Sequence, residues 1–392
     1  MTNMIRSALS IFMVVLLVVP MGFAQPPERV KMPAREGERT AETPADPIGD
    51  GPHVGWGSRG RIVDIGYFCD GENRPGVVMI GGADTLRFTG WCNDFGQKYL
   101  VVAENPRVPP VRVDGVSRIM AVSDLHGEYD EFCDFLQHSD VIDDKLQWIW
   151  GEGHLVIVGD VFDRGDQVTE CLWLIHQLEW QAREAGGAVH MLLGNHETIA
   201  LRGDERYVNE KYLNGIVKSV GGEDYEYRRL FTPNMELGRW LRSKNAAMVI
   251  NDILFVHGGI SPELMRRKLS LEAINDAARE GIEYLKGDTT MPELPKLMHG
   301  SLGPMWYRGF QYGLEGRYPL IESAQLDSVL AFYGATVSVG GHSELDSVMS
   351  MHDGRTYFID VPVDEIHGFE GLYWEAGVFY RVKPDGAKIR MN

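Results

Sequence analysis

The strongest indication of the fold is the stretch VIVGDVFDRG, residues 156–165. In it a short apolar run ends abruptly in glycine and aspartate. A run this short and this rich in valine and isoleucine is typical of a strand buried on both faces. Further stretches follow the same pattern, and each ends in a polar residue beside glycine: residues 119–127, 191–197, 253–259 and 337–342. The sequence therefore predicts an α/β fold in which several buried strands end in polar side chains.

The polar side chains at these strand ends should lie close together, because ligands in open α/β sheets collect at the carboxyl ends of strands. The side chains concerned are two aspartates, one asparagine and four histidines: Asp124, Asp160, Asn195, His126, His196, His257 and His342. Their donor atoms are oxygen and nitrogen, without a thiolate. Such a set suits two hard-to-borderline divalent ions better than a structural zinc site, so we expect a catalytic metal centre.

The ordered motifs resemble the signature of calcineurin-like metallophosphoesterases of the phosphoprotein phosphatase type. They are DLHG at residues 124–127, GDVFDRG at 159–165, GNHE at 194–197, HGG at 257–259 and GH at 341–342. The match covers roughly residues 116–365, and residues 194–212 and 303–309 are similar to the bacterial and plant Shewanella-like phosphatases. The resemblance implies a metallophosphoesterase β-sandwich flanked by helices, with a dinuclear site at its rim.

The resemblance also implies a set of ligands for each of two divalent ions, with Asp160 shared as the bridge. The sets are Asp124, His126 and Asp160 for the first ion, and Asp160, Asn195, His257 and His342 for the second. Two ions about 3.5–4 Å apart can generate hydroxide at neutral pH and neutralise the charge of a phosphate ester. Oxygen and nitrogen ligands admit Mn, Fe, Zn or Co, so the identity of the metal stays open.

Further residues of the motifs would act on the substrate. The resemblance makes His196 the general acid that protonates the departing alkoxide or phenoxide, with Asp163 bonded to its other ring nitrogen. Arg164 and Arg308 would bind phosphate oxygens, since a planar guanidinium offers paired donors that lysine lacks. A surface ion pair is the alternative for Arg308.

Together these features predict a dinuclear metal-dependent phosphomonoesterase that hydrolyses phosphorylated protein side chains by attack of metal-bound hydroxide. Its partner would be a phosphorylated protein or peptide, or a small phosphate ester. The turn GGHSE around His342 departs from the eukaryotic serine/threonine phosphatases, so phosphotyrosine and phosphoserine or phosphothreonine both stay open. A nucleoside polyphosphate hydrolase, resembling dinucleoside tetraphosphatases, and a metal-bound binding module without turnover are the alternatives. The oligomeric state is open.

The amino terminus predicts a secreted bacterial protein. Residues 1–24 combine Arg6, an apolar run at residues 9–19, Pro20 and small residues before Gln25, as in a cleaved signal peptide. A span needs roughly 20 apolar residues, so we expect no membrane contact after cleavage, with an uncleaved anchor as the alternative. Cleavage takes the formal charge from −18 to −19, and such a chain should not bind nucleic acid. We expect the periplasm or the outside of the cell.

Composition divides the rest of the chain into three regions. Residues 25–51, rich in proline, glutamate, arginine and threonine, predict a flexible linker. Residues 52–115 hold short β-type runs punctuated by glycine and proline, and predict a small β-rich N-terminal region. The metallophosphoesterase domain would span residues 116–392, with helical patterns at residues 129–137 and 168–185 between its strands.

Two segments between the metal motifs, residues 203–242 and 261–300, are candidates for walls or lids of the site. The first holds tyrosines that could contact substrate or pack within the segment: Tyr207, Tyr212, Tyr225 and Tyr227. Cys69 and Cys92 lie in the N-terminal region, where an oxidising compartment permits a disulfide, and two unpaired thiols are the alternative.

Overall fold

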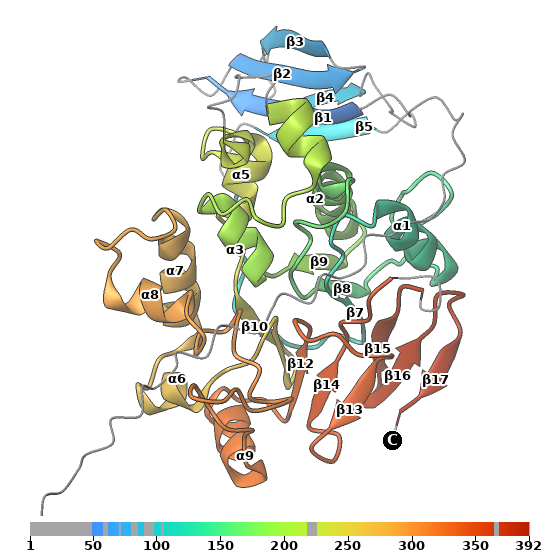
Figure 1. Cartoon of the computed structure of the whole chain (residues 1–392). Helices are drawn as coiled ribbons and strands as arrows, with labels where there is room; N and C mark the ends of the chain where they lie inside the picture. Colours follow the sequence, from blue (N-terminus) through green and yellow to red (C-terminus); the bar gives the residue numbers. More distant parts are fainter. Residues whose placement is uncertain are drawn as a thin grey trace, which may run out of the picture. The chain divides into compact units, whose positions relative to one another are not determined.

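The computed structural model describes residues 49–57, 62–69, 72–79, 85–89, 98–102, 106–217, 226–363 and 368–391 (Figure 1). The predicted signal peptide, the predicted linker up to residue 48, and Cys92 lie outside these residues. The question of a disulfide between Cys69 and Cys92 therefore stays open. In the described part of the chain, no helix is both long and apolar enough to cross a membrane.

Two six-stranded sheets form the centre of the fold. The first has the order β17 (Lys388–Arg390), β16 (Val378–Val382), β15 (Gly371–Glu375), β7 (Arg118–Val122), β8 (His154–Ile157) and β9 (Ala188–Met191). The second has the order β13 (Met349–Met351), β14 (Thr356–Phe358), β12 (Val337–Gly340), β11 (Ile253–Val256), β10 (Ala247–Ile250) and β6 (Arg112–Val113). Strands β7, β8 and β9 are parallel to one another, as are β11 and β12.

Alternate residues of the central strands pack into two different apolar clusters. In β7, Ile119 and Ala121 join a cluster shared with strands of the second sheet, such as Phe255 of β11. Met120 and Val122 point the other way, into the cluster that contains residues of the helices. Side chains alternate between the two faces of a strand, so a strand covered on both faces must be apolar throughout. The predicted β-sandwich flanked by helices is confirmed.

The helices connect these strands and cover the outer faces of the sheets (Figure 1). They are α1 (Tyr129–His138), α2 (Val168–Glu184), α3 (Asn195–Leu201), the π-helix η1 (Lys211–Val217), the 3₁₀-helix η2 (Tyr227–Phe231), α5 (Glu236–Leu241), α6 (Pro262–Arg266), α7 (Leu271–Ile282), α8 (Glu293–Met298) and α9 (Ser323–Phe332). The first two match the predicted helical patterns. Ser270 begins α7 by accepting a hydrogen bond from the Ala273 amide at 3.3 Å, as an N-cap does.

The N-terminal region forms a three-stranded antiparallel sheet and a separate two-stranded ladder. The strands are β1 (Gly49–Trp56), β2 (Ile62–Cys69) and β3 (Glu72–Met79), then β4 (Thr85–Thr89) and β5 (Lys98–Val102). The first strand begins inside the predicted linker, so the linker boundary at residue 51 is wrong. The reason is a buried pair that composition does not reveal: Asp50 is 3% exposed and its carboxylate lies 2.7 Å from His53 Nε2.

Strand β1 is fixed to helices α2 and α5 by hydrogen bonds. The Trp173 indole of α2 donates to the Pro52 carbonyl at 2.8 Å, and the Trp56 indole donates to Glu236 of α5 at 2.5 Å. The Trp56 amide also donates to the Asn234 carbonyl at 2.7 Å. A buried indole N–H needs an acceptor, so these contacts make the N-terminal sheet part of the same compact unit, Pro47–Asn392.

Two histidines on neighbouring strands make the folded state sensitive to acid. His190 of β9 lies 3.0 Å from His154 of β8, and burial, His154 and Lys244 together lower the pKa of His190 to about 3. In the unfolded chain this pKa returns to about 6.5. Below pH 6.5 the unfolded chain therefore binds a proton that the folded chain does not, and stability falls as the pH falls.

We expect His190→Gln to reduce the sensitivity of the folded state to acid. Its free energy of unfolding should fall by roughly 1–2 kcal/mol less than that of the wild type between pH 7 and pH 5. Urea unfolding at several pH values measures the difference, and His138→Gln, at the exposed end of α1, is the control. Equal losses for the wild type and His190→Gln would contradict the assignment.

Candidate metal centre

Five strands from both sheets carry polar residues to one edge of the sandwich. Strand β7 leads into a loop that holds Asp124 and His126, and β8 leads into a loop that holds Asp160. Strand β9 is followed by the start of α3, which holds Asn195 and His196. Strands β11 and β12 lead into His257 and His342. Neighbouring parallel strands end at the same edge, so side chains far apart in sequence meet there.

The loops that carry these side chains adopt an unfavourable backbone conformation. Six of the predicted site residues have positive φ: Asp124 (+54°), His126 (+45°), Asp160 (+56°), Asp163 (+70°), Arg164 (+68°) and His342 (+70°). Residues with a Cβ rarely adopt this left-handed region, and strain of this kind concentrates at functional sites. The surrounding contacts must therefore hold the loops in place.

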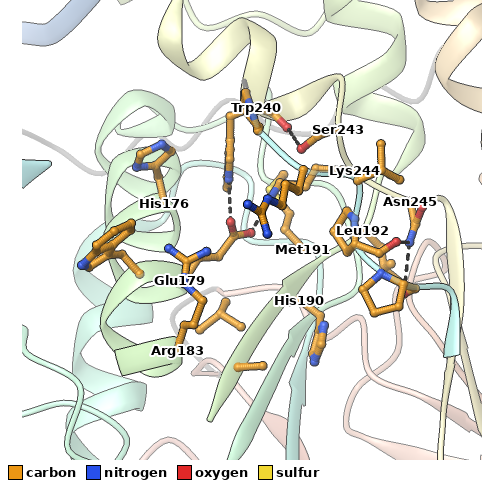
Figure 2. A pocket seen from close by; sticks show the side chains of 18 of the residues that line it. His176, Glu179, Arg183, His190, Met191, Leu192, Trp240, Ser243, Lys244 and Asn245 are labelled. Atoms are coloured by element: carbon orange, nitrogen blue, oxygen red, sulfur yellow. Dashed lines mark hydrogen bonds and ion pairs between the residues drawn. The ribbon is translucent and has the colours of Figure 1, made fainter. Parts of the chain in front are cut away.

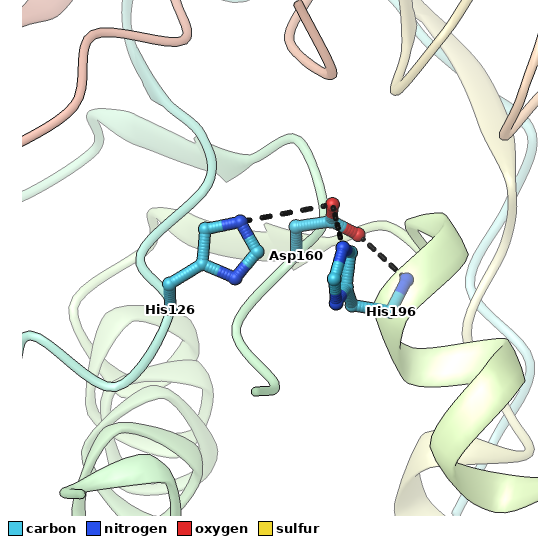
Figure 3. Close-up of side chains that lie close together, drawn as sticks. All are labelled: His126, Asp160 and His196. Carbon is cyan, nitrogen blue, oxygen red and sulfur yellow. Dashed lines mark hydrogen bonds and ion pairs between the residues drawn. The ribbon is translucent and has the colours of Figure 1, made fainter. Parts of the chain in front are cut away.

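Asp160 lies at the centre of the cluster (Figure 3). Its Oδ2 is 3.1 Å from His257 Nε2, 4.0 Å from His126 Nε2 and 3.9 Å from His196 Nε2. Although burial opposes ionisation, His257 and His196 hold the pKa of Asp160 well below its usual range. This carboxylate is therefore charged, buried and surrounded by nitrogen atoms.

The remaining predicted ligands complete the cluster. Asp124 Oδ1 lies 3.8 Å from His126 Nε2, and Asn195 Oδ1 lies 3.1 Å from His257 Nε2. His342 shares a potential cation site with Asp160 and His257, their ligand atoms lying within 4.8 Å of one another. The structure therefore brings together all the residues that the sequence proposed as metal ligands.

Two of the histidines, His126 and His342, have the neutral protonation state that a metal ligand needs. Burial and Arg164 lower the pKa of His126 to about 3, and burial and His257 hold that of His342 well below its usual range. Their Nε2 atoms are buried without a hydrogen-bond partner. His126 Nδ1 donates to the Phe162 carbonyl at 2.7 Å, which leaves the Nε2 lone pair free for a cation. These donors fit divalent metal ions.

Glu197 is the functional residue to which the sequence analysis gave no role. Its side chain is 0% exposed and accepts from the amides of Asp160 (2.9 Å), Val161 (2.6 Å) and Gly194 (2.6 Å). It thereby ties the loop after β8 to the start of α3. A glutamate three residues after the residue that begins a helix is the capping-box spacing, and that signal could have identified it.

Gly194 is required where these two loops meet. A Cβ at this position would collide with Asp160 Oδ1 and lie 2.5 Å from the Asp160 amide. Only glycine allows the backbone of the loop before α3 to approach the central carboxylate this closely.

His196 differs from the other histidines of the cluster. Its Nδ1 lies 2.7 Å from Asp163 Oδ2, whereas His126 and His257 use Nδ1 to donate to backbone carbonyls. Burial lowers the pKa of His196, but Asp160 and Asp163 outweigh it and raise the pKa overall. A histidine that keeps its proton suits acid catalysis better than metal binding.

The two predicted phosphate-binding arginines lie in different environments. Arg164 is at the rim, with its side chain 49% exposed, and its guanidinium donates to Glu344 at 2.8 Å. Arg308 is partly buried, and its Nη1 donates to the His342 carbonyl and, at 2.7 Å, to Ser343 Oγ. Arg308 therefore stabilises the loop that carries His342.

Among the tyrosines of residues 203–242, Tyr207 is the one placed beside the cluster. Its ring is 46% exposed and lies 5.2 Å from the His196 ring. Tyr212 and Tyr227 are buried and pack against each other, and Tyr225 lies outside the described residues. In residues 261–300, Asn275 of α7 bonds the backbone of Ala246 and Ala247 beside β10.

A separate cavity of about 860 Å³ lies beside α2, β9 and the residues that follow α5 (Figure 2). No predicted site residue lines it. Its Lys244 ammonium donates to Glu179 at 2.5 Å, and the Trp240 indole donates to the same carboxylate at 2.8 Å. Glu179, Lys244 and Trp240 already form hydrogen bonds with one another, so they do not form a second cluster of metal ligands like the one around Asp160.

Comparison with known proteins agrees with this geometry. The calcineurin-like phosphoesterase family pattern matches residues 117–343. The crystal structure of a cold-active protein-tyrosine phosphatase of a psychrophilic Shewanella species superposes with a TM-score of 0.79 and 32% identity, over 88% of this chain and 99% of that one. Shewanella-like protein phosphatase 2 of Arabidopsis thaliana is 28% identical over 281 residues, which cover 61% of this chain and 71% of the relative.

A second group of relatives matches a shorter segment. A symmetrical bis(5′-nucleosyl)-tetraphosphatase of Buchnera aphidicola is 29% identical over 145 residues, which cover 36% of this chain and 44% of the relative.

We expect Arg308→Lys to weaken metal binding, because a single ammonium cannot reproduce the guanidinium bonds to the His342 loop. Metal affinity should fall by about tenfold or more, as measured by competition with a chelator. Arg317→Lys, at an exposed position in the loop before α9, is the control. Unchanged metal affinity together with weaker binding of inorganic phosphate would instead assign Arg308 to the substrate.

Proposed function

Because this chain belongs to the calcineurin-like phosphoesterase family, we propose that it is a dinuclear phosphomonoesterase acting on phosphorylated protein side chains. The observation that carries the proposal is the convergence of the metal ligands on Asp160 with the His196–Asp163 pair at 2.7 Å beside them. Metal ligands without a general acid would suit a protein that only binds metal. A histidine positioned beside the ligands to donate a proton suits an enzyme that hydrolyses its substrate.

The residues that would hold two divalent ions fall into two groups that share Asp160. They are Asp124, His126 and Asp160 in the first, and Asp160, Asn195, His257 and His342 in the second. The bound ions, which we propose to be Mn, Fe or Zn, would activate water and neutralise phosphate charge. The Asp160 carboxylate suits the shared place because its two oxygens can reach two cations.

His196 would supply the proton that the leaving group needs. Asp163 is buried and accepts from His196 Nδ1, so it fixes the orientation of the ring. The opposite nitrogen, Nε2, faces the cluster, 3.9 Å from Asp160 Oδ2. A proton held on Nε2 would pass to the ester oxygen as the phosphorus–oxygen bond breaks, and Asp163 would stabilise the imidazolium before that step.

One comparison favours a protein side chain over a nucleotide as the substrate, and one contact favours phosphotyrosine among the side chains. The likeness to the Shewanella protein-tyrosine phosphatase extends over 88% of this chain, whereas that to the tetraphosphatase covers 36%. In addition, the half-exposed Tyr207 ring beside His196 offers a flat apolar surface to an aromatic leaving group. We therefore place phosphotyrosine ahead of phosphoserine and phosphothreonine.

We also propose that the chain acts in the periplasm or outside a bacterial cell, because residues 1–24 have the composition of a signal peptide. Detection of the mature chain in a periplasmic extract, with an amino terminus at Gln25, would support this location. Recovery of the intact chain in the membrane fraction would contradict it.

A substrate panel tests the proposed function. The purified protein, loaded in turn with Mn, Fe or Zn, is assayed on phosphotyrosine, phosphoserine and phosphothreonine peptides and on a dinucleoside tetraphosphate. The proposal predicts a higher kcat/KM on a phosphopeptide than on the dinucleotide. The reverse order would identify a polyphosphate hydrolase, and no turnover with any metal would leave a binding module.

We expect His196→Ala to retain metal while losing activity unequally among substrates. Alkyl phosphates need a proton on the leaving oxygen, so their kcat should fall on the order of 10²–10⁴-fold, whereas aryl phosphates with acidic leaving groups should lose far less. Metal analysis and a series of leaving groups measure both effects. Equal losses across the series, or loss of metal, would contradict the assignment of His196 as general acid.

A further inference from the structure

An ion pair at the rim of the metal centre joins the loops of the two sheets. Arg164 follows β8, and Glu344 follows His342 and β12. Their side chains meet at 2.8 Å and are 49% and 43% exposed. An exposed pair of this kind contributes little to stability, so a doubly charged phosphate with several acceptor oxygens can displace the carboxylate from the guanidinium.

The other nearby cations of the described chain also have acceptors. Arg206, whose guanidinium lies 5.5 Å from the Tyr207 ring, pairs with Asp204. The same carboxylate accepts from Lys286 at 2.6 Å. Arg308 is bonded to the His342 loop, so each of these three described cations already has an acceptor and none is reserved for a second phosphate group.

The acidic side chains near Arg164 differ in their exposure. Asp360 also interacts electrostatically with Arg164, but it is 4% exposed and therefore lies behind the surface. Glu344 is the carboxylate of this group that reaches solvent. A phosphate that binds Arg164 would therefore meet the Glu344 carboxylate at the same guanidinium.

Resting on the proposed function, we propose that Glu344 is a specificity-determining residue that selects monophosphates and disfavours polyphosphates. A monoester brings one phosphate, which exchanges places with Glu344 at Arg164. A nucleoside polyphosphate brings a second charged group to the rim, where the displaced carboxylate repels it. Selection here works by repulsion of the wrong ligand.

The test compares the binding of inorganic phosphate and pyrophosphate to the metal-loaded protein by titration calorimetry. Glu344→Gln should raise the ratio of pyrophosphate affinity to phosphate affinity by about 5- to 10-fold, and Glu344→Lys should raise it further. The matched control is Glu283→Gln, which removes another exposed carboxylate paired with an arginine, Arg242, at 2.7 Å. Metal content is measured after each titration, so that chelation by pyrophosphate is not mistaken for binding.

The outcomes separate this inference from the proposed function. An unchanged affinity ratio in both Glu344 variants, with metal content intact, would overturn the role of Glu344 even if the enzyme hydrolyses phosphopeptides. A raised ratio in a protein that hydrolyses no ester would support Glu344 as a discriminating residue while the phosphatase assignment fails. An equal rise in Glu283→Gln would reduce the effect to overall charge and overturn the inference.

Discussion

The side chain of Glu197 holds together the two loops that carry Asp160, Asn195 and His196. Its carboxylate accepts hydrogen bonds from the amides of Asp160, Val161 and Gly194. The Phe162 amide also donates to it at 3.3 Å. Each buried amide left without an acceptor would cost about 1–3 kcal/mol, and the loop after β8 has residues at positive φ, an unfavourable conformation that needs support from such contacts. One buried carboxylate thus maintains the conformation on which the central ligand depends.

The fold brings together charges that would separate in a less constrained chain. Burial and Asp160 raise the pKa of Asp124, while Asp160 itself stays ionised next to His257. Burial opposes protonation of His257, but Asp160 and Asp124 raise its pKa to about 10. A cation at Asp160 would take the place of that proton, so metal binding and proton release are coupled at this position.

The segment from Tyr207 to Tyr212 supports the loop that holds Asp163 and Arg164. The Arg164 amide donates to the Tyr207 carbonyl at 2.9 Å, and Asn209 donates to the Arg164 carbonyl at 2.8 Å. The buried Tyr212 hydroxyl accepts from the Val168 amide at 2.8 Å and donates to the Asp166 carbonyl at 3.0 Å. The segment that presents an aromatic ring to the site is therefore also the one that fixes the rim arginine.

The metal ligands were predicted from the resemblance to a known family, whereas the strands and their polar ends were predicted from the sequence pattern itself. Each of those features is local: an apolar run of four or five residues, then aspartate, histidine or asparagine beside glycine, and the geometry of parallel strands turns that local pattern into a meeting point. Helices α1 and α2 could be predicted for the same reason, because residues 129–137 and 168–185 show the apolar periodicity of a helix. The role of Glu197 could have been predicted in the same way, because its spacing of three residues from Gly194 is also a local feature.

The partner of each polar side chain depends on the tertiary structure. Arg164 and Glu344 are 180 residues apart, and nothing in the sequence around either indicates that they form an ion pair. The same holds for Arg308, whose bond to the His342 carbonyl joins separate loops, and for Tyr207, which composition cannot distinguish from the buried Tyr212. The start of strand β1 could not be foreseen either, because Asp50 interacts not only with His53 but also with Thr169 and Lys211, which are distant in sequence. A side chain's environment is set by segments distant in sequence, so it appears only when the chain has folded.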